Sequence, residues 1–109
     1  MSYDETLAVE LRKLLGRRQN LSEKKMFGGL GFLLNGNICC GAWKEFLILR
    51  LGADAARQVL REPHARPFDI TGRPMRGWAM VDPAGWRDNA RLRRWIGWTV
   101  EFTAGLPAK

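Results

Sequence analysis

The dipeptide Asn35-Gly36 constrains the fold of this chain more than any other feature of its sequence. A two-residue type I′ turn needs a positive φ at both central positions, and Asn followed by Gly meets that need at the least steric cost. Apolar residues stand on both sides of the dipeptide, so the sequence predicts a β-hairpin. Its opposed pairs, counted outward from the turn, are predicted to be Leu34 with Asn37, Leu33 with Ile38, and Phe32 with Cys39.

Alternation along the two strands divides these side chains between the two faces of the sheet. One face is predicted to carry Leu30, Phe32, Leu34 and Cys39. The other face is predicted to carry Leu33, Ile38 and Cys40. Both faces are apolar, so we expect a cover on each, helical on one side and a second copy of the chain on the other. Gly31, inside a strand, indicates a bulge or a close approach of backbone.

Helical periodicity frames this hairpin. Ser2 and Glu5 form a capping box before a helix whose apolar stripe ends near Gly16. A short helix is expected over residues 53–60, and a last helix from an N-cap at Asp88 to Gly105. The apolar stripe of the first helix is Leu7, Leu11, Leu14 and Leu15. That of the last is Leu92, Trp95, Ile96, Thr99 and either Phe102 or Thr103.

Five strands are expected, over residues 24–27, 30–34, 38–43, 46–51 and 78–81. The segment 62–77 holds three of the five prolines and is predicted to be a long loop with an extended piece at 68–70. Strands grouped in sequence, with helices before and after, indicate an α+β fold. We therefore expect an antiparallel meander flanked by three helices, forming a single domain over residues 1–109.

Composition indicates the class of protein and its cellular location. A hydrophobic fraction of 46% and a charged fraction of 27% are typical of a soluble globular protein. No apolar run suggests a membrane span, and no secretory signal is visible, so we expect a cytoplasmic protein. Cys39 and Cys40 are expected to be inert buried thiols on opposite faces of a strand. With His64 as the only histidine, no metal site is expected.

Two blocks of the sequence carry distinctive motifs. The first, residues 24–41, carries Met26-Phe27-Gly28-Gly29, Phe32, Asn35-Gly36 and Cys40-Gly41. The second, residues 66–83, carries Gly72-Arg73-Pro74-Met75 and Gly77-Trp78. Together the two blocks resemble the N-terminal domain of the TfoX/Sxy family. With helices expected before, between and after these blocks, the resemblance covers essentially the whole chain.

This resemblance implies a secretion-chaperone-like α+β domain that pairs into a homodimer. It also implies regulation of natural competence genes together with a cyclic-AMP-dependent transcription activator as protein partner. Members of the family carry a helical second domain after this one, whereas the present sequence stops at Lys109. The resemblance supplies no catalytic residues and no cofactor.

Arginines supply the main polar candidates for a site. The net charge of +7 favours acidic partners or nucleic acid. Arg66, Arg73 and Arg76 crowd one loop, either as a guanidinium cluster for an anion or acidic partner, or packed by their stems on Trp78 and Phe68. A second set, on or near the last helix, is Arg87, Arg91 and Arg94. That set is expected to be either a solvated helix face or part of a nucleic-acid surface.

Five tryptophans are many for 109 residues. Trp95 fits the core, whereas Trp43, Trp86 and Trp98 lie at predicted corners or off the stripe and are either candidate interface aromatics or ordinary partly buried rings. No nucleophile stands at readable spacing from His64, so no enzymatic activity is expected. The sequence thus favours a non-enzymatic regulatory interaction domain. Direct nucleic-acid binding and small-anion binding at the Arg66, Arg73 and Arg76 loop remain the alternatives.

Overall fold

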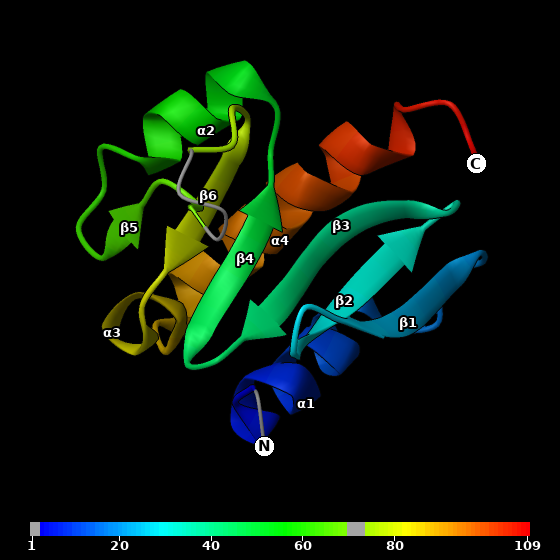
Figure 1. Ribbon diagram of the computed structural model, residues 1–109, viewed down its shortest axis with the longest axis horizontal. Coiled ribbons are helices and arrows are strands. Elements are labelled where there is room, and N and C mark those ends of the chain that lie inside the picture. The colour runs from blue at the N-terminus through cyan, green and yellow to red at the C-terminus, as the bar shows by residue number, and fades with distance from the viewer. Residues whose placement is uncertain (1–2, 70–73) are drawn as a thin grey trace.

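The computed structural model describes residues 3–69 and 74–109, and contains one antiparallel sheet with helices (Figure 1). Along the chain the elements are α1 (Glu5–Leu15), β1 (Leu21–Met26), β2 (Gly29–Leu34), β3 (Asn37–Trp43), β4 (Phe46–Arg50), α2 (Ala53–Val59), β5 (Ala65–Arg66), β6 (Trp78–Val81), α3 (Pro83–Trp86) and α4 (Asn89–Ala104). The strands lie in the order β1-β2-β3-β4-β6-β5. This arrangement confirms the predicted α+β meander. It adds two elements that the sequence did not predict, the two-residue strand β5 and the short helix α3.

The turn between β2 and β3 is the predicted one. Asn35 and Gly36 have φ values of 55° and 81°, as a type I′ turn requires. The first two predicted pairs are confirmed, because Leu34 lies opposite Asn37 and Leu33 lies opposite Ile38.

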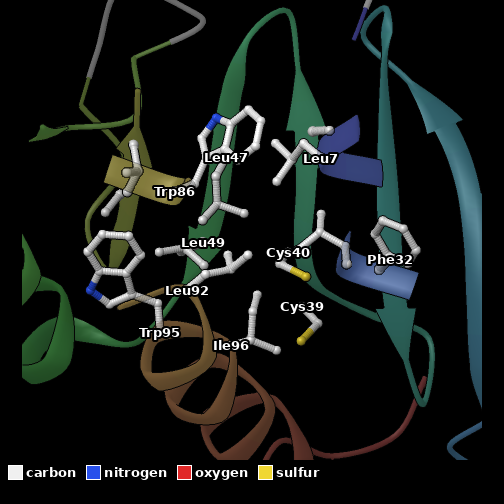
Figure 2. Close-up of a cluster of buried hydrophobic side chains, with 14 of the residues drawn as sticks. Leu7, Phe32, Cys39, Cys40, Leu47, Leu49, Trp86, Leu92, Trp95 and Ile96 are labelled. Atoms are coloured by element: carbon white, nitrogen blue, oxygen red, sulfur yellow. The ribbon is translucent and has the colours of Figure 1, made fainter. Parts of the chain in front are cut away.

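The third predicted pair is wrong, because Phe32 lies opposite Cys40 rather than Cys39. The register shifts between Phe32 and Leu33, so Cys39 is the extra residue of a β-bulge in β3. A bulge interrupts the alternation of side chains. Cys39 and Cys40 therefore both enter the core beneath the helices, and the prediction that they lie on opposite faces is also wrong. Figure 2 shows the two sulfur atoms within the same buried cluster.

The described helices all bury residues in one core cluster. Helix α4 passes behind β3 and β4 in Figure 1, and its residues Trp95 and Ile96 are 0% and 3% exposed. Helix α1 adds Leu7, Leu11 and Leu15, each fully buried, while Leu14 is half-buried. Between these helices and the strands lies one contiguous apolar core (Figure 2). From the sheet it receives mainly Leu30, Phe32, Leu34, Leu47, Leu49, Ala79 and Val81.

Capping residues fix where the two long helices begin. The carboxylate of Asp4 accepts a hydrogen bond from the Leu7 N–H at 2.9 Å, so α1 begins at Glu5 and the predicted N-cap at Ser2 is wrong. A carboxylate in this position satisfies one of the free N–H groups of the first turn. Asp88 caps α4 in the same way, as predicted. Among the described helices, none has the length and apolar character needed to cross a bilayer.

Candidate interaction surface

The face of the sheet turned away from the helices carries a groove with three glycines in its lining. Gly29, Gly31 and Gly41 belong to β2 and β3 and line this groove, which has a volume of about 240 Å³. A Cβ atom at Gly41 would lie 2.6 Å from the Leu30 carbonyl oxygen, closer than real Cβ contacts allow. At Gly29 the corresponding distance to the Ala42 carbonyl oxygen is 2.5 Å. Glycine is therefore required here for close packing of the strands, and the sheet keeps a hollow where side chains would stand.

Aromatic rings form one wall of the groove. Trp43 stacks on Phe46 at a centroid distance of 6.4 Å, and its edge meets Phe68 at the same distance. Phe68 in turn packs against Trp78 at 5.8 Å. Ile48 and Met80, on neighbouring strands, complete a second apolar cluster that is separate from the helix-side core. Phe68 reaches this wall from the loop after β5, so the wall joins the sheet to a segment outside it.

An exposed phenyl ring also lines the groove. Phe27 is 78% exposed, the largest exposed fraction among the large hydrophobic side chains of the described residues. It lies in the turn between β1 and β2, where Phe27 and Gly28 have φ values of 50° and 78°. A positive φ at a bulky residue costs free energy. The turn therefore holds an apolar side chain in water at the edge of an apolar groove.

Cations surround the aromatic wall. The Lys44 ammonium lies 4.6 Å from the Trp43 ring centroid, and the Arg66 guanidinium lies 5.3 Å from that of Phe46. Arg50 stands 5.6 Å from the Trp78 ring and 6.0 Å from the Phe102 ring of α4. Within the described residues, none of these three cations has a carboxylate within 4.0 Å. They are held on the rim by cation–π contacts and keep their charge free for another partner.

Residues 13–103 match the family model of the TfoX N-terminal domain. The chain belongs to the TfoX N-terminal domain family. This match confirms the resemblance seen in the two sequence blocks, which both fall inside the matched range. No curated protein and no solved structure matches the chain significantly.

The first arginine set of this TfoX N-terminal domain is only partly described. Arg66 lies at the rim of the groove, on the strand β5. Arg76 is exposed and lies beside Trp78, near the same wall. Arg73 falls outside the described residues, so the predicted anion site formed by all three arginines stays a prediction. Of the two interpretations, Arg66 fits packing against an aromatic ring, although the ring is Phe46 rather than Trp78 or Phe68.

The second arginine set does not form one free helix face. Arg87 precedes α4 and lies over the Trp86 ring at 5.3 Å. The Arg91 guanidinium is 3.7 Å from the Asp88 carboxylate, and Arg94 is paired with Glu62. Carboxylates thus neutralise Arg91 and Arg94, two of the three arginines that the sequence predicts as part of a nucleic-acid surface.

The three tryptophans predicted as interface aromatics lie in different environments. Trp43 is a wall residue of the groove, and Trp98 is half-buried where Arg94 lies 5.4 Å from its ring. Trp86 was predicted to be an exposed interface aromatic, but it is only 2% exposed and its indole N–H donates to the Glu45 carbonyl. Helix α3 turns this ring into the core, which makes it a packing residue. The groove aromatics Phe46, Phe68 and Trp78 were not singled out as interface residues by sequence reasoning.

Two neighbouring thiols are the main titratable groups in the core. A hydrogen bond from the Cys40 thiol lowers the pKa of Cys39 to about 7, and the same bond together with burial raises the pKa of Cys40. Both side chains are 0% exposed, so reagents in water do not reach them in the native fold. No group of three metal-binding side chains occurs within residues 3–69 and 74–109.

Proposed function

We propose that this chain is a non-enzymatic regulatory domain that binds a partner protein over the groove on the open face of its sheet. The observation that carries the proposal is the exposed Phe27 ring beside a glycine-floored, aromatic-walled groove. Exposed apolar surface of this kind is uncommon on monomers and is typical of interaction sites. The lining offers rings, thioethers and backbone, which suit contact with apolar side chains better than proton transfer.

The family supports a role in regulation. The resemblance to competence regulators of the TfoX family, which act with a transcription activator, makes such an activator one candidate partner of this chain. A cytoplasmic location would follow from this role. In this proposal the domain contributes a docking surface and leaves the chemistry of gene control to the partner.

The proposal is tested by comparing two surface variants in affinity capture from the cells that produce the protein. Phe27→Asp removes the exposed ring from the groove edge, and Asp tolerates a positive φ better than most residues. Val9→Asp is the matched control, because Val9 is 44% exposed on α1, on the helical side. We expect the same proteins to be retained by the unmodified chain and by Val9→Asp, and lost with Phe27→Asp. Equal retention by both variants would refute the proposal.

A homodimer predicted from the family likeness would use the same open face. Two copies joined there would bring the cations of both rims together, which opposes tight association. Light scattering after size exclusion measures the assembly directly. If the protein is a dimer and Phe27→Asp dissociates it, the groove binds a second copy of the chain and not a partner protein.

Nucleic-acid binding is the second candidate, supported by the net charge of +7. It would depend on Arg87 and Arg93, which have no carboxylate within 4.0 Å among the described residues. Such binding must weaken steeply with added salt, because counterions are released from the phosphates. A gel-shift assay at low ionic strength with duplex DNA and with single-stranded RNA tests it, and no shift would exclude it.

A further inference from the structure

We propose that the groove binds a segment of another protein that presents apolar side chains flanked by Asp or Glu, with the rim cations Lys44, Arg50 and Arg66 receiving its carboxylates. The inference rests on the proposed function of the open face and adds the chemistry of the partner. It follows from the charge of the rim together with the apolar lining of the groove.

The rim cations have no carboxylate partner, unlike several cations elsewhere in the molecule. Arg12, Lys13, Arg91 and Arg94 each have a carboxylate within 4.0 Å, whereas Arg17, Arg87 and Arg93 have none among the described residues. Around the groove Lys44, Arg50 and Arg66 have aromatic rings instead, at 4.6 to 5.6 Å. Lys24 adds a further exposed cation, because it lies opposite Gly31 of the groove floor. Lys44, Arg50 and Arg66 have no carboxylate within 4.0 Å among the described residues, so acidic side chains of a partner would complement them.

The size of the groove favours side chains over a cofactor. Sites for drug-sized ligands span about 300–1,000 Å³, whereas this groove has about 240 Å³. Its openness to solvent along the sheet suits a segment that places a few apolar anchors into the hollow, as helices do in apolar grooves. Methionines at two sides, Met26 and Met75, give the lining adaptable contact surface.

Single-stranded nucleic acid is the strongest rival, because it also combines negative charge with flat apolar groups. It binds by stacking bases on exposed aromatic faces. Here the faces of the wall rings are already occupied, which leaves the exposed Phe27 ring for stacking: Trp43 stacks on Phe46, and Lys44, Arg66 and Arg50 lie over three of the wall rings. A peptide needs no free ring face, because its aliphatic and aromatic side chains fill the glycine-floored hollow. The geometry therefore favours the peptide.

The test selects binders from a library of short random peptides displayed on phage, using the full chain as bait. Four baits are compared: the unmodified protein, Phe27→Asp, the rim double variant Lys44→Asp with Arg66→Glu, and the control double variant Arg17→Glu with Arg93→Glu. The two double variants change the net charge equally. Arg17 and Arg93 are exposed and have no ion pair among the described residues.

We expect the unmodified bait and the control variant to enrich peptides in which Leu, Ile, Phe or Trp is flanked by Asp and Glu. We expect the rim variant to lose those peptides and to enrich Lys and Arg at the flanks instead. For the most enriched acidic peptide, fluorescence anisotropy is expected to give about tenfold weaker binding to the rim variant. High salt is expected to reduce this difference, since it screens the rim charges.

Each other outcome overturns the inference. Enrichment without an acidic bias, or an acidic bias that the rim variant retains, means that rim charge does not choose the partner; the proposed function then stands if Phe27→Asp abolishes enrichment. No enrichment by the unmodified bait overturns the inference. Enrichment that Phe27→Asp leaves intact overturns the proposed function as well. If a single-stranded oligonucleotide binds the groove and displaces the peptides, the groove is a nucleic-acid site. If a stable dimer buries the groove, its occupant is a second copy of the chain.

Discussion

The two faces of the sheet are made by the same strands, yet they are built from different side chains. On the covered face the strands present Phe32, Leu47 and Leu49, which α1 and α4 bury completely or almost so. On the open face the same strands present glycine and half-buried rings, together with the smaller cluster of Ile48 and Met80. Large aliphatic residues fit where the chain supplies its own cover. The open face, with its hollow, its methionines and its unpaired cations, has the character of surface that another molecule covers.

The largest test of this comparison is truncation of one tryptophan on each face. Trp95→Ala empties a site that is 0% exposed between α4 and the sheet, and is expected to lower the free energy of unfolding by about 3–5 kcal/mol. Trp43→Ala, on the open face, is expected to cost less than half as much, because Trp43 is only half-buried. Urea denaturation followed by circular dichroism measures both. Equal losses would mean that the open face is as much a part of the core as the covered one.

The second test compares the effect on stability of substituting a glycine in the sheet with that of substituting one in helix α4. Gly41→Ala would place its Cβ 2.6 Å from the Leu30 carbonyl oxygen, so the strands must separate and we expect a loss of about 1–3 kcal/mol. Gly97→Ala on α4 meets nothing within 4 Å and is expected to raise stability by about 0.5–1 kcal/mol through helix propensity. Opposite signs in thermal denaturation would support the close approach at the groove floor. A neutral Gly41→Ala would contradict it.

The bulge ties the covered face to helix α4 through one hydroxyl group. The Thr99 hydroxyl lies against the carbonyl oxygens of Cys39 and Arg50 and can donate its one proton to either of them. Thr99→Val keeps the shape but leaves buried carbonyl groups without this partner, at an expected cost of about 1–3 kcal/mol. Thr103 serves as the control, because its hydroxyl donates to the Thr99 carbonyl within the same helix; Thr103→Val should cost less. Chemical denaturation of the two variants decides whether Thr99 stabilises the bulge.

This bulge also marks where sequence reasoning stopped being sufficient. Asn35-Gly36 encodes its turn locally, so two strand pairs could be predicted from it. The extra residue at Cys39 has no local signal, because Cys39 and Cys40 are both small and apolar and either one fits the core. Only packing against Thr99, sixty positions away in the chain, distinguishes them. A register that depends on a distant helix cannot be predicted from a dipeptide.

The groove was hidden from the sequence for the same reason. Gly31 is predicted to mark a bulge or a close approach of backbone, but the Met26 side chain is what lies nearest to its Cβ position, and the close backbone approaches are at Gly29 and Gly41. The wall, however, needs Phe68 from a distant loop beside Trp43 and Trp78. Trp86 shows the converse error, because the turn signal of Asp82-Pro83 did not reveal the short helix that buries the ring. The sequence shows how many arginines the chain has, but not that Arg91 and Arg94 are paired with carboxylates.

The smallest expected effect concerns the ion pair that ties α1 to the edge strand β1. The Arg12 guanidinium donates two hydrogen bonds of 2.9 Å to the Glu23 carboxylate, and the hydrogen bond from Arg12 lowers the pKa of Glu23. Both side chains are more than a third exposed, so Arg12→Met is expected to cost only about 0.2–1 kcal/mol at neutral pH.

The pH dependence of this loss has a definite sign. A carboxyl group whose pKa is lower in the folded chain stabilises the fold above its unfolded pKa of about 4.3. That stabilisation is lost as the pH falls through the lower pKa of the folded state, so the difference between Arg12→Met and the unmodified protein should shrink in acid. Urea denaturation at neutral and at acidic pH measures it. Arg57→Met is the control, because its partner Asp54 is 93% exposed on the same helix. A penalty for Arg12→Met that stays constant with pH would show that Arg12 stabilises the helix–strand contact by the packing of its stem and not by its charge.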